Sequence, residues 1–245
     1  MNAVVLSLTT RQLLSRRRTI LMAGFALLPV AVAVVFRFAG DSETDAAEFT
    51  SKGILGALVV STLLPLVALV MGTAALGAEI EDGTAVYLLS KPISRREIVL
   101  SKLLPAWAVT SALVVPVTVA AGFIGMGGAE PGLVAAYAVG AALGGLVYCA
   151  IFLAASVLTS RALIAGLVYV FIWENTVTRL FQGTRVLSVR HYTIGVADLL
   201  SNVPDRVLNA KLGGLEALVL MVAVGSLATL FAVRRLERFE VGESS

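Results

Sequence analysis

Long apolar runs separated by short polar stretches make up most of this chain. Six runs approach or exceed the length of a membrane span: residues 19–36, 54–78, 103–125, 133–158, 162–180 and 215–233. Crossing about 30 Å of hydrocarbon takes roughly 20 apolar residues as a helix, and no other open structure satisfies its backbone in lipid. We therefore predict an all-α integral membrane protein with six transmembrane helices, organised as a single transmembrane domain over residues 1–245.

Composition supports this fold class. The chain is 58% hydrophobic and only 14% charged, and its mean hydropathy is +0.92. A soluble domain of this size has no place for so much apolar surface. The first run follows three arginines and looks at first like a signal peptide, but no small-residue cleavage site precedes the acidic loop 41–48. We expect a retained helix.

Orientation follows from the distribution of basic residues. With a cytoplasmic N-terminus, that side holds twelve of the 19 Lys and Arg residues. The other side holds the remaining seven, which are Arg37, Lys52, Arg179, Arg185, Arg190, Arg206 and Lys211. Basic residues near span ends are retained inside, so we expect both termini and the segment 79–102 in the cytoplasm, and the segment 181–214 outside. The net charge of +3 is then a topology signal, and no nucleic-acid partner is required.

Several classes of chemistry find no support in the sequence. None of the four lysines follows a glycine, so the chain has no phosphate-binding P-loop and is not expected to be an ATPase. Metalloprotease and serine-hydrolase motifs are also missing. Cys149, the single cysteine, is interpreted as a packing residue inside the fourth run, and His191, the single histidine, as a solvated loop residue. We therefore expect no metal, no cofactor and no catalytic residue in this chain.

The apolar runs contain their own packing signals. Ala136, Gly140 and Gly144 recur every fourth residue and predict a smooth helix face that another backbone can approach closely. Pro65, Pro105 and Pro116 lie inside or at the start of runs, where a proline removes one backbone donor and allows a bend.

The fifth run ends in the polar residues Trp173, Glu174 and Asn175. A carboxylate at the bilayer centre costs roughly 2.5 to 3.5 kcal/mol on insertion scales, so we place Glu174 near the outer boundary as a solvated helix end. The alternative is that the three residues line a substrate path. The segment 181–214 then shows helical spacing at 199–203 and 207–212, which predicts two short helices on or in the outer leaflet.

The most informative stretch is the polar segment 79–102. Ser94 followed by Glu97 is a capping box, and Pro92 separates this helix from what precedes it. A helix is therefore expected to start at Ser94 and to run into the third span. The apolar patch 86–89 lies between acidic and basic clusters, which suits docking of a partner protein or packing of the loop on its own bundle.

This segment resembles the cytoplasmic signature of type-2 ATP-binding-cassette (ABC) export permeases, including the permease of the nitrous-oxide-reductase maturation operon. The matching residues are Glu79, Ile80, Glu81, Asp82, Gly83, Thr84, Tyr87, Leu88, Leu89, Ser90, Pro92, Ser94, Arg95 and Lys102. The departures are Lys91 before the proline and Pro105, where many relatives carry glycine.

The resemblance implies a six-helix type-2 ABC exporter permease in the cytoplasmic membrane. Such a chain pairs with a second permease, identical or homologous, and with two cytoplasmic ATPase subunits that bind ATP and Mg. It implies that nine residues couple the permease to the ATPase: Glu79, Glu81, Asp82, Gly83, Thr84, Pro92, Ser94, Arg95 and Lys102. It also suggests the first, second and fifth spans as walls of the transport path. The alternative function is a membrane anchor or assembly scaffold that binds a cytoplasmic partner without transport.

Overall fold

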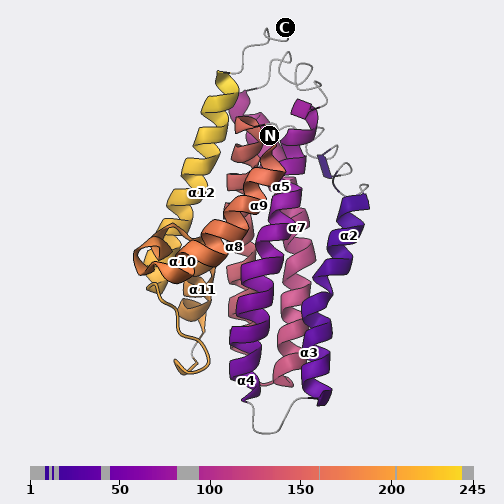
Figure 1. Ribbon diagram of the computed structural model, residues 1–245, viewed down its shortest axis with the longest axis vertical. Helices are drawn as coiled ribbons and strands as arrows, with labels where there is room; N and C mark the ends of the chain where they lie inside the picture. The colour runs from indigo at the N-terminus through magenta and orange to yellow at the C-terminus, as the bar shows by residue number, and fades with distance from the viewer. Residues whose placement is uncertain are drawn as a thin grey trace.

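The computed structural model describes residues 9, 10, 13, 17–39, 45–81, 94–159, 161–201 and 203–238, and these residues form a helical bundle (Figure 1). The elements are α2 (Arg17–Ala26), α3 (Leu28–Ala39), α4 (Ala46–Glu48), the π-helix η1 (Phe49–Leu63), α5 (Leu64–Glu81), α7 (Arg95–Met126), α8 (Pro131–Leu158), α9 (Ala162–Val168), the π-helix η2 (Tyr169–Val177), α10 (Thr178–Leu180), the 3-10 helix η3 (Gln182–Leu187), α11 (Val189–Leu200) and α12 (Gly214–Glu237). Helix α8 is central and packs against α5, α7, α11 and α12.

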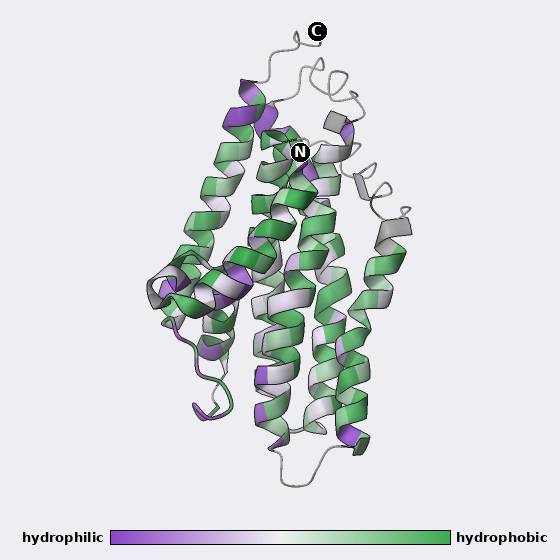
Figure 2. Cartoon of the chain, viewed as in Figure 1, coloured by the Kyte–Doolittle hydropathy of each residue, from purple (hydrophilic) through white to green (hydrophobic). Residues whose placement is uncertain are grey.

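The predicted spans are largely present as helices. Among the described residues, five helical stretches are long and apolar enough to cross a membrane: Ile20–Ala39, Ala46–Gly77, Arg95–Met126, Pro131–Leu158 and Gly214–Glu237. Figure 2 colours most residues of these helices as hydrophobic. The remaining run, 162–180, forms only a shorter apolar helix, Ala162–Val177. Five spans are therefore supported by length, and the sixth is not.

We name the two ends of the bundle by residues. The upper end in Figure 1 holds the end of α5 at Glu81 and the start of α7 at Ser94, and the lower end holds α4 and the end of α7. Helix α2 starts on the upper side and α12 ends there. Helix α9 also starts on the upper side and crosses the front of the bundle (Figure 1). Helix α10, which follows, lies between the upper and lower ends and does not reach the lower end.

Helix α7 starts and ends as its sequence dictates. Ser94 is extended, and its side chain accepts a hydrogen bond from the Glu97 amide at 3.3 Å, which confirms the predicted helix start. Gly127 ends the helix with a φ of 63°, a left-handed conformation that favours glycine. Pro105 and Pro116 lie inside this uninterrupted 32-residue helix, so neither ends it.

Two stretches of the bundle are π-helical, which the sequence pattern did not predict. In η1, the Ser61 hydroxyl donates to the Gly56 carbonyl five residues earlier, at 2.6 Å. In η2, the side-chain amide of Asn175 donates to the Val170 carbonyl, also five residues earlier, at 3.1 Å. Pro65 lies just after η1 gives way to α5, where its missing donor is tolerated. π-Helical turns are rare and occur frequently at functional sites.

The segment after η2 differs from the expected pair of short helices. It contains the 3-10 helix η3 and one helix of 12 residues, α11. The first expected helix, at 199–203, overlaps only the last two residues of α11. The second, at 207–212, is absent: Val207 lies in a turn, and residues 208–212 are not helical. Pro204 accounts for the turn, since its carbonyl accepts from the Val207 amide at 2.8 Å.

The smooth face of α8 receives α11. A Cβ atom added at Gly140 would lie 2.8 Å from the Thr193 carbonyl oxygen, and one at Gly144 would lie 2.2 Å from the Thr193 hydroxyl oxygen. The predicted close backbone approach is therefore confirmed, and its partner is α11. These glycines lie roughly 14 to 20 Å along α8 from its first residue, Pro131, at 1.5 Å of rise per residue.

We predict that Gly144→Val separates α11 from α8. The added side chain meets the side chain of Thr193, and overpacking of this kind costs about 1 to 3 kcal/mol. Gly132→Val is the matched control, because nothing lies within 4 Å of the Gly132 position on the same helix. Thermal unfolding in detergent should show a lower midpoint for Gly144→Val alone. Equal midpoints for the two variants would contradict this packing.

Candidate functional site

The upper end of the bundle brings two of the predicted coupling residues together. Lys102 on α7 donates to the Glu79 carboxylate near the end of α5. The Lys102 side chain is only 2% exposed and that of Glu79 is 22% exposed. A lysine ammonium buried this deeply requires a charged partner, so the pair fixes the end of α5 against α7.

The start of α7 is more accessible. Ser94 and Arg96 are exposed and Arg95 is partly buried, just above the Glu79–Lys102 pair along α7. Of the other predicted coupling residues, Glu81 is the last residue of α5. Asp82, Gly83, Thr84 and Pro92 lie outside the described residues, as does the apolar patch 86–89.

The second predicted cluster, Trp173, Glu174 and Asn175, lies in η2. Glu174 is 1% exposed, and its carboxylate accepts hydrogen bonds from the Tyr169 hydroxyl at 3.0 Å, the Val189 amide at 2.9 Å and the Ser188 hydroxyl. The Trp173 indole donates to the Leu187 carbonyl at 3.1 Å. Glu174 and Trp173 therefore connect η2 to η3 and to the start of α11.

This geometry corrects the expected location of Glu174. We expected a solvated helix end near the outer boundary, but the carboxylate is buried. The side-chain amide of the neighbouring Asn175 donates to the Ser61 carbonyl at 3.4 Å. Ser61 lies midway along the 32-residue stretch Ala46–Gly77. The cluster is thus level with the middle of the bundle. Glu174 is tolerated there because donors of its own chain surround the carboxylate.

His191 also differs from its expected environment. It lies on α11 instead of in a solvated loop, and its ring nitrogen Nδ1 is 2.9 Å from the Ser188 hydroxyl. Partial burial, followed by the charges of Arg190 and Arg185, lowers the pKa of His191 to about 4. Among the described residues, no group of three His, Cys, Asp or Glu side chains could hold a metal ion. Cys149 is fully buried and 3.4 Å from the Thr110 hydroxyl, as expected for a packing residue.

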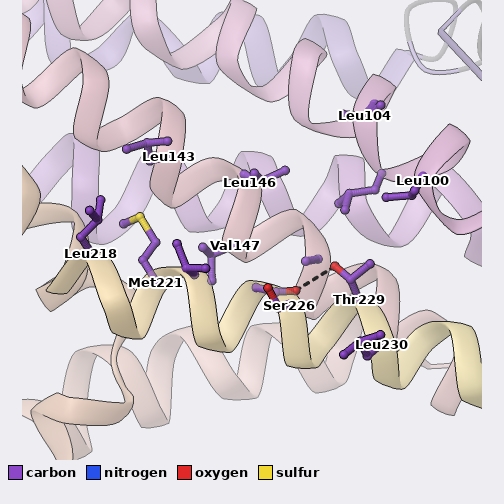
Figure 3. Close-up of a pocket in the computed structure, with 14 residues that line it drawn as sticks. Leu100, Leu104, Leu143, Leu146, Val147, Leu218, Met221, Ser226, Thr229 and Leu230 are labelled. Carbon is purple, nitrogen blue, oxygen red and sulfur yellow. Dashed lines mark hydrogen bonds between the residues drawn. The ribbon is translucent and has the colours of Figure 1, made fainter. Parts of the chain in front are cut away.

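An apolar groove of about 630 Å³ opens between α7, α8 and α12 (Figure 3). Leu100 and Leu230 lie at one end and Leu143 and Leu218 at the other. Among the described residues that line it, only Ser226 and Thr229 carry hydroxyls, and the Thr229 hydroxyl donates to the Gly225 carbonyl at 2.8 Å. The hydropathy pattern does not predict this groove, since its lining comes from three helices that are all predominantly apolar.

We predict an asymmetric response to breaking the Glu79–Lys102 pair. Glu79→Gln leaves the fully buried Lys102 charge without this carboxylate and should cost roughly 3 kcal/mol, whereas Lys102→Met leaves a Glu79 that reaches solvent and should cost less. The double variant Glu79→Gln with Lys102→Met should recover most of the stability. The stability of wild type and the three variants is compared by thermal unfolding in detergent. If the double variant is no more stable than Glu79→Gln, the Glu79–Lys102 pair does not hold α5 against α7.

Comparison with known families agrees with this architecture. A search of curated proteins returns no significant match. The family model described as "ABC-2 family transporter protein" matches residues 8–190, which is more than half of the chain and includes every element from α2 to η3. Together with the five apolar helices of spanning length in the described part of the chain, this match identifies a multi-pass membrane permease component of an ABC transporter. The chain belongs to the ABC-2 transporter family.

Proposed function

We propose that this permease exports its substrate with energy from ATP hydrolysed on a separate ATPase subunit, and that the ATPase docks at the upper end of the bundle. The observation that carries this proposal is the buried Glu79–Lys102 pair. It joins the two helix ends between which the predicted docking segment runs. A force applied to that segment would therefore reach α5 and α7 together.

The contacts between helices determine which parts of the bundle that force would reach. Helices α5 and α7 both contact α8, and α5 also contacts α9. A movement at the upper end would therefore pass into the centre of the bundle and toward η2. The Ser94 cap supports this by fixing where the rigid part of α7 begins. In this proposal Lys102 positions the dock from inside the bundle, while Arg95 contacts the ATPase.

We propose that the upper end faces the cytoplasm and that the protein resides in the cytoplasmic membrane. The basic asymmetry of the sequence supports this orientation. Two permease chains, identical or homologous, would form the transport unit with two ATPases. The short fifth helix exposes four apolar side chains that are available to a second permease: Leu163, Ile164, Phe171 and Ile172. This exposure supports a path walled by the first, second and fifth spans. The π-helical turn would place three polar residues along that path and so shape it: Trp173, Glu174 and Asn175.

The orientation can be tested with single cysteines. Wild-type Cys149 is fully buried, so the native chain serves as an unreactive background. Asp45→Cys and Arg96→Cys each place a thiol at an exposed position, at the lower and upper ends respectively, and both leave the Ser94 cap in place. An impermeant thiol reagent applied to intact cells should label the first and not the second. Labelling of Arg96→Cys from outside would refute the orientation.

The docking role predicts the effect of charge reversal. Glu81→Lys and Arg95→Glu should each reduce co-purification of the ATPase and increase its salt sensitivity, because charges at the rim of an interface govern association. Membrane insertion should be unchanged. The measurements are ATPase co-purification and substrate-stimulated ATP hydrolysis in liposomes.

Asp205→Lys provides the matched control, since Asp205 is exposed in the segment between α11 and α12. It should bind the ATPase as wild type does. If Glu81→Lys and Arg95→Glu also retain binding and coupled hydrolysis, the docking role is wrong. If these variants lose ATPase binding and the wild-type protein shows no measurable transport, the result favours a membrane anchor or scaffold.

A further inference from the structure

The apolar groove between α7, α8 and α12 opens toward the lipid. Four of the side chains that line it are large, apolar and exposed: Leu100, Leu218, Val222 and Leu230. In a multi-pass membrane protein, apolar side chains exposed between the two ends of the bundle face acyl chains. Water finds almost no hydrogen-bonding partner in such a lining, so the groove is filled by an apolar group in the bilayer.

The length of the groove matches one leaflet. Leu218 and Leu230 are separated by 12 residues on α12, which is about 18 Å at 1.5 Å of rise per residue. Half of the hydrocarbon core of a bilayer is about 15 Å. Leu230 lies toward the upper end, where α12 ends. One acyl chain that runs from the upper leaflet surface to the bilayer centre therefore fits the groove along its length.

Both helices that border the groove at its upper end lead to an arginine. Leu100 and Leu230 lie at the same end of the groove (Figure 3). Arg96 precedes Leu100 by four residues on α7, and Arg234 follows Leu230 by four residues on α12. Residues four apart are neighbours on a helix surface, and here they are about 6 Å apart along the axis. The head-group layer is about 5 to 7 Å thick, so these two exposed arginines lie at its level.

The charge at this level stays positive when the nearby acids are counted. Residues 94–97 and 234–238 hold five arginines and two glutamates. The Glu79–Lys102 pair is neutral, and Glu81 ends α5 at the same end of the bundle. If the two glutamates and Glu81 each neutralised one arginine, two positive charges would remain in the described part of this end. An anionic group is therefore favoured over a zwitterionic one.

We propose that the groove binds an anionic phospholipid. One acyl chain lies along the groove, and the phosphate lies between Arg96 and Arg234. Guanidinium groups present planar pairs of donors that match phosphate oxygens, and basic sites between transmembrane helices bind anionic head groups. The inference requires only a membrane-spanning bundle. It depends neither on ATPase docking nor on which end faces the cytoplasm, so it can fail or succeed independently of the proposed function.

The head-group part is tested on the full chain, purified and stripped of lipid in a neutral detergent. Phosphatidylglycerol and phosphatidylcholine with the same acyl chains are titrated, and native mass spectrometry counts the bound lipids. Wild type should bind one phosphatidylglycerol in preference to phosphatidylcholine. The double variant Arg96→Gln with Arg234→Gln should bind phosphatidylglycerol about tenfold more weakly, a loss of about 1.4 kcal/mol, and should lose the preference.

Arg161→Gln is the matched control for charge. Arg161 is exposed and directly precedes α9, which starts on the upper side but contributes no residue to the groove. This variant should bind both lipids as wild type does. Thermal unfolding without added lipid should be the same for all these proteins, because each substitution changes an exposed side chain.

The acyl-chain part is tested with two valines of α12. Val222 lines the groove and is 63% exposed, whereas Val219 is 61% exposed and does not line it. Val222→Phe should fill the groove and weaken the binding of both phospholipids. Val219→Phe adds the same side chain beside the groove and should leave both affinities unchanged.

Three results would each overturn the proposal. The first is equal binding of the two phospholipids by wild type. The second is a double arginine variant that binds like Arg161→Gln, and the third is Val222→Phe that binds like Val219→Phe. The same spectra report the number of protein chains. If wild type is a dimer that only Val222→Phe separates, the groove binds a second permease chain and the lipid proposal is wrong.

Discussion

The need to satisfy backbone groups away from water determines the shape of this permease. Helices meet that need within their own segment, and five helical stretches among the described residues are long and apolar enough to span a membrane. The short fifth helix does not reach as far, and the chain after it turns at the level of the bundle centre. That turn is possible because side chains bind its backbone: the Glu174 carboxylate accepts from the Val189 amide, and Trp173 and Tyr192 donate to the carbonyls of Leu187 and Val186.

The same constraint divides the protein into two parts with different physical character. At the upper end, one buried ion pair joins α5 to α7. In the corner around η2 and α11, neutral and charged groups share many hydrogen bonds, and basic side chains gather beside them. The first part suits transmission of a mechanical signal between helices. The second part is polar, and its hydrogen bonds hold η2 against the start of α11. Helices α5 and α9 connect the two.

Much of the fold could be predicted because its signals are local. Apolar run length predicts six spans, and five of them are present as helices of spanning length among the described residues. The Ser94 hydroxyl predicts the start of α7, and glycine spacing on α8 predicts a close helix contact. The rest depends on partners distant in sequence. Nothing near Glu174 reveals that Ser188 and Val189 will surround it, and apolar composition does not distinguish a π-helix from an α-helix. Hydropathy also overestimated the fifth span, because it counts apolar residues without showing where the chain turns.

The bonding of Glu174 has a consequence for the order in which the protein is made. Two of the groups that donate to its carboxylate, Ser188 and Val189, are translated after the helix that carries it, whereas the third, Tyr169, precedes it on that helix. Until they arrive, an ionised carboxylate in lipid is penalised by about 2.5 to 3.5 kcal/mol, so the helix 162–177 is a poor membrane segment alone. It becomes stable when α11 folds onto it. Helix α8 is synthesised earlier and already offers Gly140 and Gly144 as the surface that receives α11. Biogenesis should therefore insert residues 162–200 as one unit.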